Sequence, residues 1–234
     1  MKEIPWTGLN DFLPMVISQP KSKDEMFLFR GQPCNSPLLP KIARKDPLKN
    51  TSVLEMEMLS EFRLRGARFL IQDMSDLDLL AIAQHHGMAT RLLDWTTNPL
   101  VALWFSCINK DENNSHFYIY RASKQLFFDQ DADKDIFNLP VTKIFRPKLN
   151  NPRIIAQQGW FSLHNYRQNL NGEGLYTGFD KDILHFIWLW HVEIPANEKI
   201  QILLSLNSLG INYESLFPDI DGLCKNINFM HESM

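Results

Sequence analysis

The chain has 234 residues, of which 44% are hydrophobic, and this is enough for one large domain with a buried core. Its formal net charge of −3 gives no general attraction to nucleic acid, and its three widely spaced cysteines exclude a zinc ribbon or a disulfide framework. No signal-peptide core begins the chain, and no apolar run approaches the roughly 20 residues that cross a membrane. We therefore expect a single cytoplasmic domain over residues 1–234, with its core at about 6–223.

The first expected elements are a hydrophobic strand and a long helix. The strand is FLFRGQ, at residues 27–32, and Gly31 is expected to end it, which leaves Arg30 at the end of a hydrophobic run. The helix is expected over residues 51–73, with Ser52 and Glu55 as a capping box. A permanent cation at the end of a buried strand needs either a structural partner or a ligand.

Capping residues mark two further helices. Ser75 is the expected N-cap of a helix over residues 75–87, and Asn98 is that of a helix over 98–108. Strands are expected at 115–122 and 182–195, a helix at 197–210 and a short helix at 213–217, followed by a turn in PDIDG, 218–222. Helices interleaved with strands indicate an α+β or α/β fold.

The segment with the densest polar groups lies between two apolar helices, at residues 83–106. It contains His85, His86, Arg91, Asp94, Thr96 and Thr97. Burying such groups is costly unless they are paired, so Asp94 either pairs with Arg91 or caps a turn, or else the segment faces a ligand. The two adjacent histidines point about 100° apart on a helix, which disfavours a shared metal ion. No metal site is expected.

Four segments together closely resemble the FRG domain family, over about residues 6–223. They are FRGQ, QHHGMATRLLDWTTNPLVALWFS, RIIAQQGWF and GINYESLFPDIDGL. The family occurs in bacterial and phage-related proteins, including defence systems. The resemblance therefore implies a single FRG domain in an effector or toxin.

The order of these motifs is also distantly similar to that of ADP-ribosyltransferases. Those folds begin with a strand that carries Arg or His, continue with a hydroxyl motif that leads into an A-x-x-F helix, and end on a strand with a catalytic Glu. The matching segments here are Phe29 to Gly31, Asp94 to Thr97 with Ala102 and Phe105, and Arg153 to Phe161. This similarity implies a mixed or split β-sheet flanked by helices, an enzyme, and NAD as substrate.

The similarity also implies site residues, and we expect three of them, Arg30, Thr96 and Gln157, to converge on one pocket. The candidate catalytic residues are Arg30, Thr96, Gln157 and Asp94, and the candidate NAD-binding residues are Phe29, Arg30, Gly31, Gln32, His86, Arg91, Thr97 and Gln158. A guanidinium presents a planar fork of donors to phosphate or ribose oxygens. Gly31 would let the ligand approach the backbone closely.

Gln157 stands where such transferases carry a glutamate. Glutamine can hydrogen-bond a ribose, but it supplies no negative charge to a developing cation. Asp94 is the candidate substitute; alternatively, the protein binds a nucleotide without cleaving it. In a third interpretation, Gln157 and Gln158 are an amide pair at a strand edge that satisfies the backbone of FRGQ.

The remaining charged and aromatic groups suggest partners less strongly. One basic cluster is either a solvated face or a docking surface for nucleic acid; it contains Lys41, Arg44, Lys45, Arg63, Arg65 and Arg68. For a transferase, the expected acceptor of the ADP-ribosyl group is nucleic acid or protein. His164, His185 and His191 lie among aromatic residues and are expected in the core or at its edge. Asp219 and Asp221 would pair with Arg30 or Arg91 if the end of the chain packs beside the pocket.

Overall fold

The computed structural model describes residues 1–19, 22–109, 112–148, 151–168 and 174–232. A mixed sheet of seven strands forms its centre, in the order β1-β9-β4-β2-β3-β6-β5. The strands are β1 (Lys2–Glu3), β2 (Glu25–Gln32), β3 (Leu92–Thr96), β4 (Ser115–Ser123), β5 (Lys143–Phe145), β6 (Gly159–Leu163) and β9 (Leu189–Ile194). Neighbouring strands are antiparallel except for β1 and β9. A separate hairpin contains β7 (Tyr166–Gln168) and β8 (Gly174–Tyr176).

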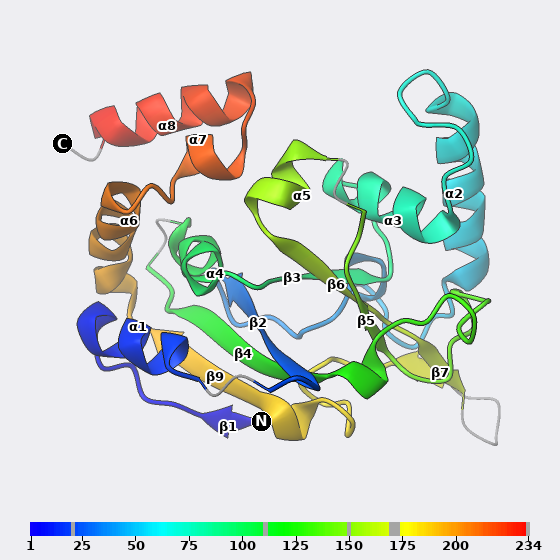
Figure 1. Cartoon of the computed structure of the whole chain (residues 1–234), viewed down its shortest axis with the longest axis horizontal. Coiled ribbons are helices and arrows are strands. Elements are labelled where there is room, and N and C mark those ends of the chain that lie inside the picture. The colour runs from blue at the N-terminus through cyan, green and yellow to red at the C-terminus, as the bar shows by residue number, and fades with distance from the viewer. Residues whose placement is uncertain (20–21, 110–111, 149–150, 169–173, 233–234) are drawn as a thin grey trace.

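Helices gather on one side of this sheet (Figure 1). They are α1 (Leu9–Ile17), α2 (Ser52–Arg65), α3 (Asp76–His85), α4 (Pro99–Cys107), α5 (Pro152–Ala156), α6 (Lys199–Ser208), α7 (Tyr213–Leu216) and α8 (Ile220–Glu232). The α+β class with a mixed sheet flanked by helices, which the sequence predicted, is confirmed. Within the described ranges, no helix combines the length and the apolar character that a membrane crossing requires.

The three largest hydrophobic clusters among the described residues hold the layers together. The largest lies between β2, β4 and β9 and the helices α1, α4 and α6, and it includes Phe29, Leu103 and Phe117. A second joins α2 and α3 to β3, β5 and β6. The third covers the opposite face of the sheet with loop residues such as Leu38 and Phe179. The strands on either side of the β2–β3 boundary therefore pack against different groups of helices.

Helix caps predicted two helices well and one poorly. The side chains of Ser75 and Asn98 accept backbone hydrogen bonds at the starts of α3 and α4, as expected. The expected helix over 51–73 is shorter, because α2 ends at Arg65 and the chain continues in turns. The capping box is wrong: Thr51 precedes the helix, and the Glu55 carboxylate bonds Arg91 instead of the helix start.

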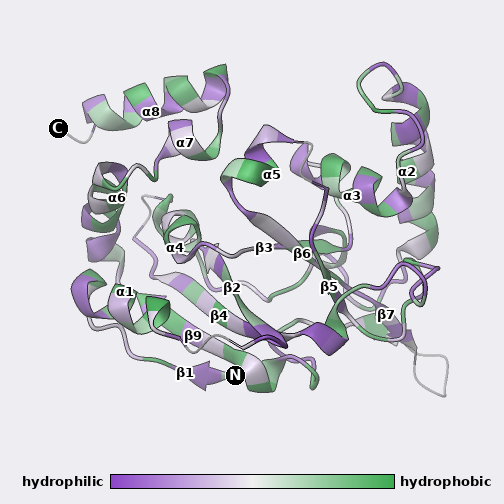
Figure 2. Ribbon diagram, viewed as in Figure 1, coloured by the Kyte–Doolittle hydropathy of each residue, from purple (hydrophilic) through white to green (hydrophobic). Residues whose placement is uncertain are grey.

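The strand expectations need two corrections. β2 continues through Gly31 to Gln32, so glycine does not end it. The expected strand over 182–195 begins only at Leu189, after a 3₁₀ turn at Phe186–Trp188. The short helix after residue 212 is present as α7, but the expected turn in PDIDG is the beginning of α8. Hydrophilic and hydrophobic residues alternate along α8, as Figure 2 shows, and its buried residue Phe229 joins the largest cluster.

Candidate functional site

The central sheet splits between β2 and β3. These strands are neighbours, but they pair at a single position, where Phe29 lies opposite Thr96. β2 pairs with β4, in contrast, along its whole length from Glu25 to Gln32. A cavity of about 330 Å³ lies at the split and includes residues of both diverging strands in its wall.

Side chains from six elements line this cavity. Its apolar and aromatic wall contains Phe29, Trp95, Val101, Ala102, Phe105, Ile154, Trp160, Phe161 and Phe217. Its polar wall contains Arg30, Gln84, His85, Asp94, Thr96, Arg153 and Gln157, and the backbone of Gly31 and Gly159 completes the surface. The volume is at the lower end of the roughly 300–1,000 Å³ of small-molecule pockets. An aromatic wall beside a few convergent polar groups is typical of such pockets.

Arg30 spans the split. Its Nε donates to Oε1 of Gln32 at 3.1 Å, and its Nη1 donates to the backbone oxygen of Asp94 at 2.8 Å. Among the residues that the structure describes, none accepts a hydrogen bond from Nη2. Burial lowers the pKa of Arg30 to about 10, so the guanidinium stays charged at neutral pH. Arg30 therefore bridges strands that do not pair with each other there, and it keeps one donor group for a ligand.

Asp94 brings a carboxylate to the same wall. Its side chain is 64% exposed, and Oδ2 lies 3.9 Å from Nη1 of Arg30. Gln84 donates from Nε2 to Oδ1 of Asp94 at 3.0 Å, while the Thr90 hydroxyl donates to Oε1 of Gln84 and so fixes the orientation of the amide. Of the alternatives for Asp94, pairing with Arg91 is wrong, because Arg91 bonds Glu55. The Asp94 carboxylate is therefore available to the cavity.

Gly31 has a packing role that the sequence did not reveal. A Cβ atom at this position would lie 1.9 Å from the backbone oxygen of Ala102 and 2.4 Å from the backbone nitrogen of Ser106. Both belong to α4, so only glycine lets this helix pack so closely against β2. Gly31 lines the cavity, but helix packing is a sufficient reason for its identity.

Thr96 and Gln157 are joined to each other. The Thr96 hydroxyl donates to the backbone oxygen of Gln157 at 2.7 Å and accepts from the backbone nitrogen of Asn98 at 3.0 Å. Gln157 donates from Nε2 to the backbone oxygen of Leu216 at 3.1 Å. Its Oε1 accepts no hydrogen bond within the described residues. Thr96 therefore fastens α5 to β3, whereas Gln157 keeps an acceptor beside the cavity.

The strand-edge interpretation of Gln157 and Gln158 is wrong. Gln157 is the C-cap of α5, and Gln158 follows it with a φ of 48°, so the pair turns the chain from α5 into β6. Gln158 accepts from the Thr97 hydroxyl at 3.1 Å instead of satisfying β2. The backbone of FRGQ is paired with β4.

Two cationic or titratable residues in the wall were not predicted as site residues. Arg153 donates from Nε to Oδ2 of Asp219 at 2.7 Å, and its Nη2 also bonds that oxygen. His85 is half-buried, and burial, followed by the neighbouring His86 and Arg153, lowers its pKa below 6.5. Arg153 belongs to the RIIAQQGWF motif, so the motif could have indicated it as a site residue. That Arg153 lies near His85, in contrast, follows only from the fold.

Comparison with known proteins agrees with part of this picture. The model of the FRG domain family matches residues 25–115, from β2 to the first residue of β4. The chain carries an FRG domain. No curated protein and no solved structure matches the chain. The FRG match includes Arg30 and Asp94 but ends before Arg153 and Gln157, so the α5 wall of the cavity lies outside the matched region.

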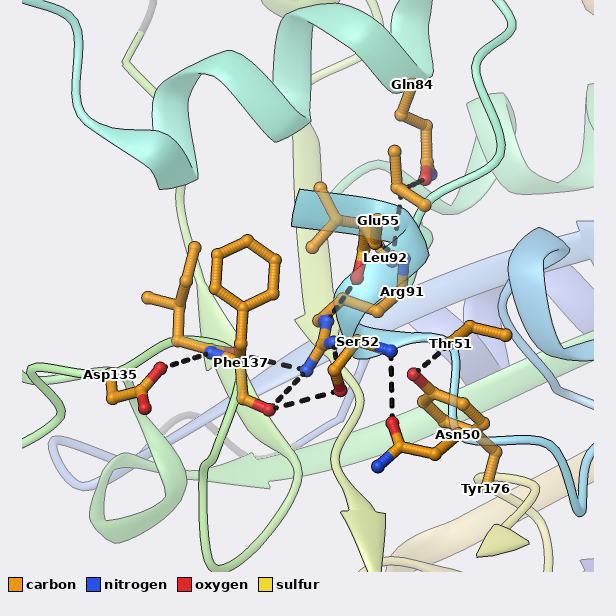
Figure 3. Close-up of polar contacts among 12 residues, drawn as sticks. Asn50, Thr51, Ser52, Glu55, Gln84, Arg91, Leu92, Asp135, Phe137 and Tyr176 are labelled. Carbon is orange, nitrogen blue, oxygen red and sulfur yellow. Dashed lines mark hydrogen bonds and ion pairs between the residues drawn. The ribbon is translucent and has the colours of Figure 1, made fainter. Parts of the chain in front are cut away.

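Arg91 lies in the FRG domain but away from the cavity. Its side chain and that of Glu55 are both 0% exposed, and the two form an ion pair. Figure 3 shows its guanidinium bonded to Glu55, to Ser52 and to the backbone of Phe137, and Nη1 also donates to the backbone oxygen of Ile136. Every nitrogen of the guanidinium is therefore occupied, which contradicts an NAD-binding role for Arg91.

Four more predicted NAD-binding residues of the chain lie outside the cavity wall: Gln32, His86, Thr97 and Gln158. Gln32 instead orients Arg30, and its own amide donates to the backbone oxygen of Ser36 at 2.9 Å. His86 is the C-cap of α3 and is exposed. The predicted residues that do line the cavity are Phe29, Arg30, Gly31, Asp94, Thr96 and Gln157.

The other charged candidates are largely paired. Arg63 bonds Asp76 at 2.6 Å and Arg65 bonds Glu61 at 2.7 Å, which favours a solvated face over a strong polyanion site. His164, His185 and His191 are buried and each ring has a hydrogen-bond partner, as expected for core residues. Across the described ranges, no group of three His, Cys, Asp or Glu side chains is placed to hold a metal ion.

Proposed function

We propose that this FRG-domain protein binds a nucleotide in the split-sheet cavity and transfers ADP-ribosyl groups from NAD. The observation that carries the proposal is the meeting of Arg30, Asp94 and Gln157 at one cavity, although they come from separate segments of the chain. A nucleotide has an aromatic base, a ribose and phosphate groups. The cavity offers aromatic side chains, an amide and charged groups of both signs to match them.

Arg30 is the proposed anchor for phosphate or ribose oxygens. It is 12% exposed, so its charge acts in a partly desolvated place where it is screened less than on an open surface. Its guanidinium is oriented by Gln32 and by the backbone of Asp94, and its Nη2 has no acceptor among the described residues. A pre-oriented arginine with a free donor is well suited to bind an anionic oxygen.

Asp94 is the proposed carboxylate of the reaction. In the transfer, the bond between ribose C1′ and the nicotinamide nitrogen breaks, and its electron pair leaves with nicotinamide. An acceptor oxygen or nitrogen then bonds C1′ and loses its proton to solvent. Positive charge develops on the ribose, and a fixed carboxylate stabilises it. Gln157 accepts a hydrogen bond from a ribose hydroxyl at Oε1, since its Nε2 already donates to the backbone oxygen of Leu216.

A second candidate function is nucleotide binding without turnover. Two observations favour it: Gln157 is neutral, and the Asp94 carboxylate already interacts with Gln84 and with the charge of Arg30. In that case the cavity senses a nucleotide and the FRG domain passes no group to an acceptor. The two functions share their binding chemistry and differ only in the fate of the glycosidic bond.

One experiment separates these functions. Purified protein is incubated with NAD, released nicotinamide is measured by chromatography, and binding of ADP-ribose is measured by calorimetry. We expect Asp94→Asn to reduce nicotinamide release by about a hundredfold or more, because it removes the charge and keeps the hydrogen bond from Gln84. We expect Arg30→Lys to weaken ADP-ribose binding by about ten- to a hundredfold, because lysine lacks the planar donor fork. Asp76→Asn, which removes an exposed ion pair outside the cavity, is the control.

The outcomes point in different directions. Wild-type binding without nicotinamide release favours the sensing function. If wild-type protein neither binds ADP-ribose nor cleaves NAD, the nucleotide proposal is wrong. If Arg30→Lys binds ADP-ribose as tightly as wild type, Arg30 does not bind the ligand through its donor fork, and its role is only to bridge β2 and β3. For a toxin or a defence effector with a nucleic acid or protein acceptor, growth arrest on expression is expected, relieved by Arg30→Ala.

A further inference from the structure

A second arginine of the cavity is engaged by an internal carboxylate. Arg153 stands on α5 and lines the cavity together with Arg30. Its Nε and Nη2 both donate to Oδ2 of Asp219. Its guanidinium carbon lies 5.3 Å from the ring centre of Phe217, which is itself part of the cavity wall. An arginine at a cavity wall therefore presents its donors to an acid of the same chain.

Asp219 is placed so that it can release Arg153 without losing its own support. It lies between α7 and α8, and its Oδ1 accepts from the backbone nitrogen of Gly222 at 2.9 Å. This hydrogen bond and then Arg153 lower the pKa of Asp219, so the carboxylate is ionised at neutral pH. The side chains of Arg153 and Asp219 are 27% and 35% exposed. Ion pairs with such exposure are weak, and a better anion displaces one partner easily.

We propose that Arg153 is a second anion-binding residue of the cavity and that Asp219 competes with the ligand for it. A ligand with two linked phosphate groups would place one near Arg30 and the other at Arg153, where it takes the place of Asp219. This inference rests on the proposed nucleotide binding and specifies it: the site selects a nucleoside diphosphate moiety over a monophosphate. Binding also breaks the ion pair between Asp219 and α5, while the hydrogen bond from Gln157 to the backbone of Leu216 remains.

The chemistry of the exchange favours phosphate. Arg153 already uses two neighbouring nitrogens on one oxygen, whereas a phosphate offers two or more oxygens to the same fork. Arg30 and Arg153 border one cavity whose wall carries Asp94 as its carboxylate, so the wall has an excess of positive charge once Arg153 leaves Asp219, and this excess attracts a phosphate. If Arg153 and Asp219 only fasten α5 to the end of α7, removing the acid can weaken that contact but cannot strengthen ligand binding.

The test compares ADP-ribose, which has two linked phosphates, with AMP, which has one, by calorimetry at pH 7.5. Asp219→Asn keeps an oxygen for the Gly222 backbone and removes the competing charge. We expect this variant to bind ADP-ribose at least threefold more tightly than wild type, with a smaller change for AMP. We expect Arg153→Met to reduce ADP-ribose affinity to that of AMP. Asp76→Asn removes the exposed Arg63 ion pair outside the cavity and should change neither affinity.

The results separate this inference from the function on which it rests. If wild-type protein binds ADP-ribose but Asp219→Asn binds it equally or more weakly, the competition is overturned while nucleotide binding stands. The competition is also overturned if Arg153→Met keeps the wild-type ratio of ADP-ribose affinity to AMP affinity. This second test remains valid even if the Asp219→Asn variant does not fold. If wild-type protein binds neither compound, nucleotide binding and the competition fall together.

Discussion

Two arginines of the FRG domain, Arg30 and Arg91, show how differently the same side chain is used within one sheet. Arg91 and its acid Glu55 are both fully buried, and every nitrogen of the Arg91 guanidinium has an acceptor. Arg30 keeps Nη2 without an acceptor among the described residues, and its acid Asp94 is 64% exposed. The closed network leaves nothing for a ligand, whereas the open one ends at a cavity. The number of donors still available, not burial alone, separates a structural arginine from a binding one.

The largest expected effect is the difference in unfolding free energy between the variants Arg91→Met and Arg30→Met. Arg91→Met leaves Glu55 buried without its partner, which costs about 3–5 kcal/mol of unfolding free energy. Arg30→Met leaves Gln32 and the backbone oxygen of Asp94 without a donor, but neither group carries a charge, and Asp94 is exposed to water. This variant should therefore lose less than about 1.5 kcal/mol of unfolding free energy. Urea unfolding followed by fluorescence measures both variants.

A double variant serves as the control for the closed network. Arg91→Met with Glu55→Leu removes both charges and should recover part of the lost stability, because no unpaired buried carboxylate remains. If Arg91→Met is as stable as Arg30→Met, the buried pair does not hold the fold. If it is stable and loses nucleotide binding, Arg91 returns as a ligand residue.

Local patterns predicted much of the fold. The caps at Ser75 and Asn98 placed α3 and α4 within two residues of their observed bounds, and the strand expected at 115–122 agrees equally well with β4. Three helices were missed. α1 contains Pro14, α5 has only five residues, and α8 begins in a Pro-Asp sequence typical of turns. In α8 the acid of that sequence caps the first turn, and no short-range pattern distinguishes such a cap from a turn.

The site was predicted in part for a physical reason. Arg30, Thr96 and Gln157 belong to segments that each end an apolar run with a polar group, and the ends of buried runs often meet at one edge of a fold. The structure brings all three residues to one cavity. Their roles in chemistry stay predictions. Arg91 was misplaced because its partner Glu55 is 36 residues away, and a local rule assigned that acid to a helix cap. Contacts over such distances follow from the fold and leave no local signal.

Gly31, next to Arg30 at the centre of FRGQ, is expected to serve packing. We expect Gly31→Ala to destabilise the protein by about 1–3 kcal/mol or more, because its Cβ would overlap the backbone of α4. Gly159 is a matched control: it also lines the cavity, but an added Cβ there meets Ile154 at 3.5 Å, an ordinary contact distance. Thermal melting compares the two variants.

If Gly31→Ala melts at the same temperature as wild type, α4 can move to accommodate the added Cβ. The hypothesis that Gly31 lets a ligand approach the backbone would then be favoured again. A stable Gly31→Ala variant with weakened ADP-ribose binding would be direct evidence for that idea. The expected result, in contrast, divides the motif: Arg30 serves the open site, and Gly31 serves the packing beneath it.

The smallest expected effect is a pH dependence of ADP-ribose binding through His85. The pKa of His85 lies below 6.5, so the ring is neutral at pH 7.5 and gains a proton as the pH falls. The charged groups that act on it are His86, Arg153, Asp94 and Asp219, and Asp219, with its lowered pKa, stays ionised at pH 5.

The added charge at His85 strengthens attraction to a pyrophosphate, which keeps its own charge over this range. Affinity should therefore rise roughly two- to fivefold as the pH falls from 7.5 through the lowered pKa of His85. His85→Gln should flatten this profile, whereas His86→Gln, at an exposed cap, should leave most of it. Affinity that falls with decreasing pH, or a profile unchanged in His85→Gln, would mean that the phosphates do not lie beside Arg153. We expect no comparable dependence of binding from Arg91, because every nitrogen of its guanidinium has an acceptor within the protein and its network is closed to the ligand.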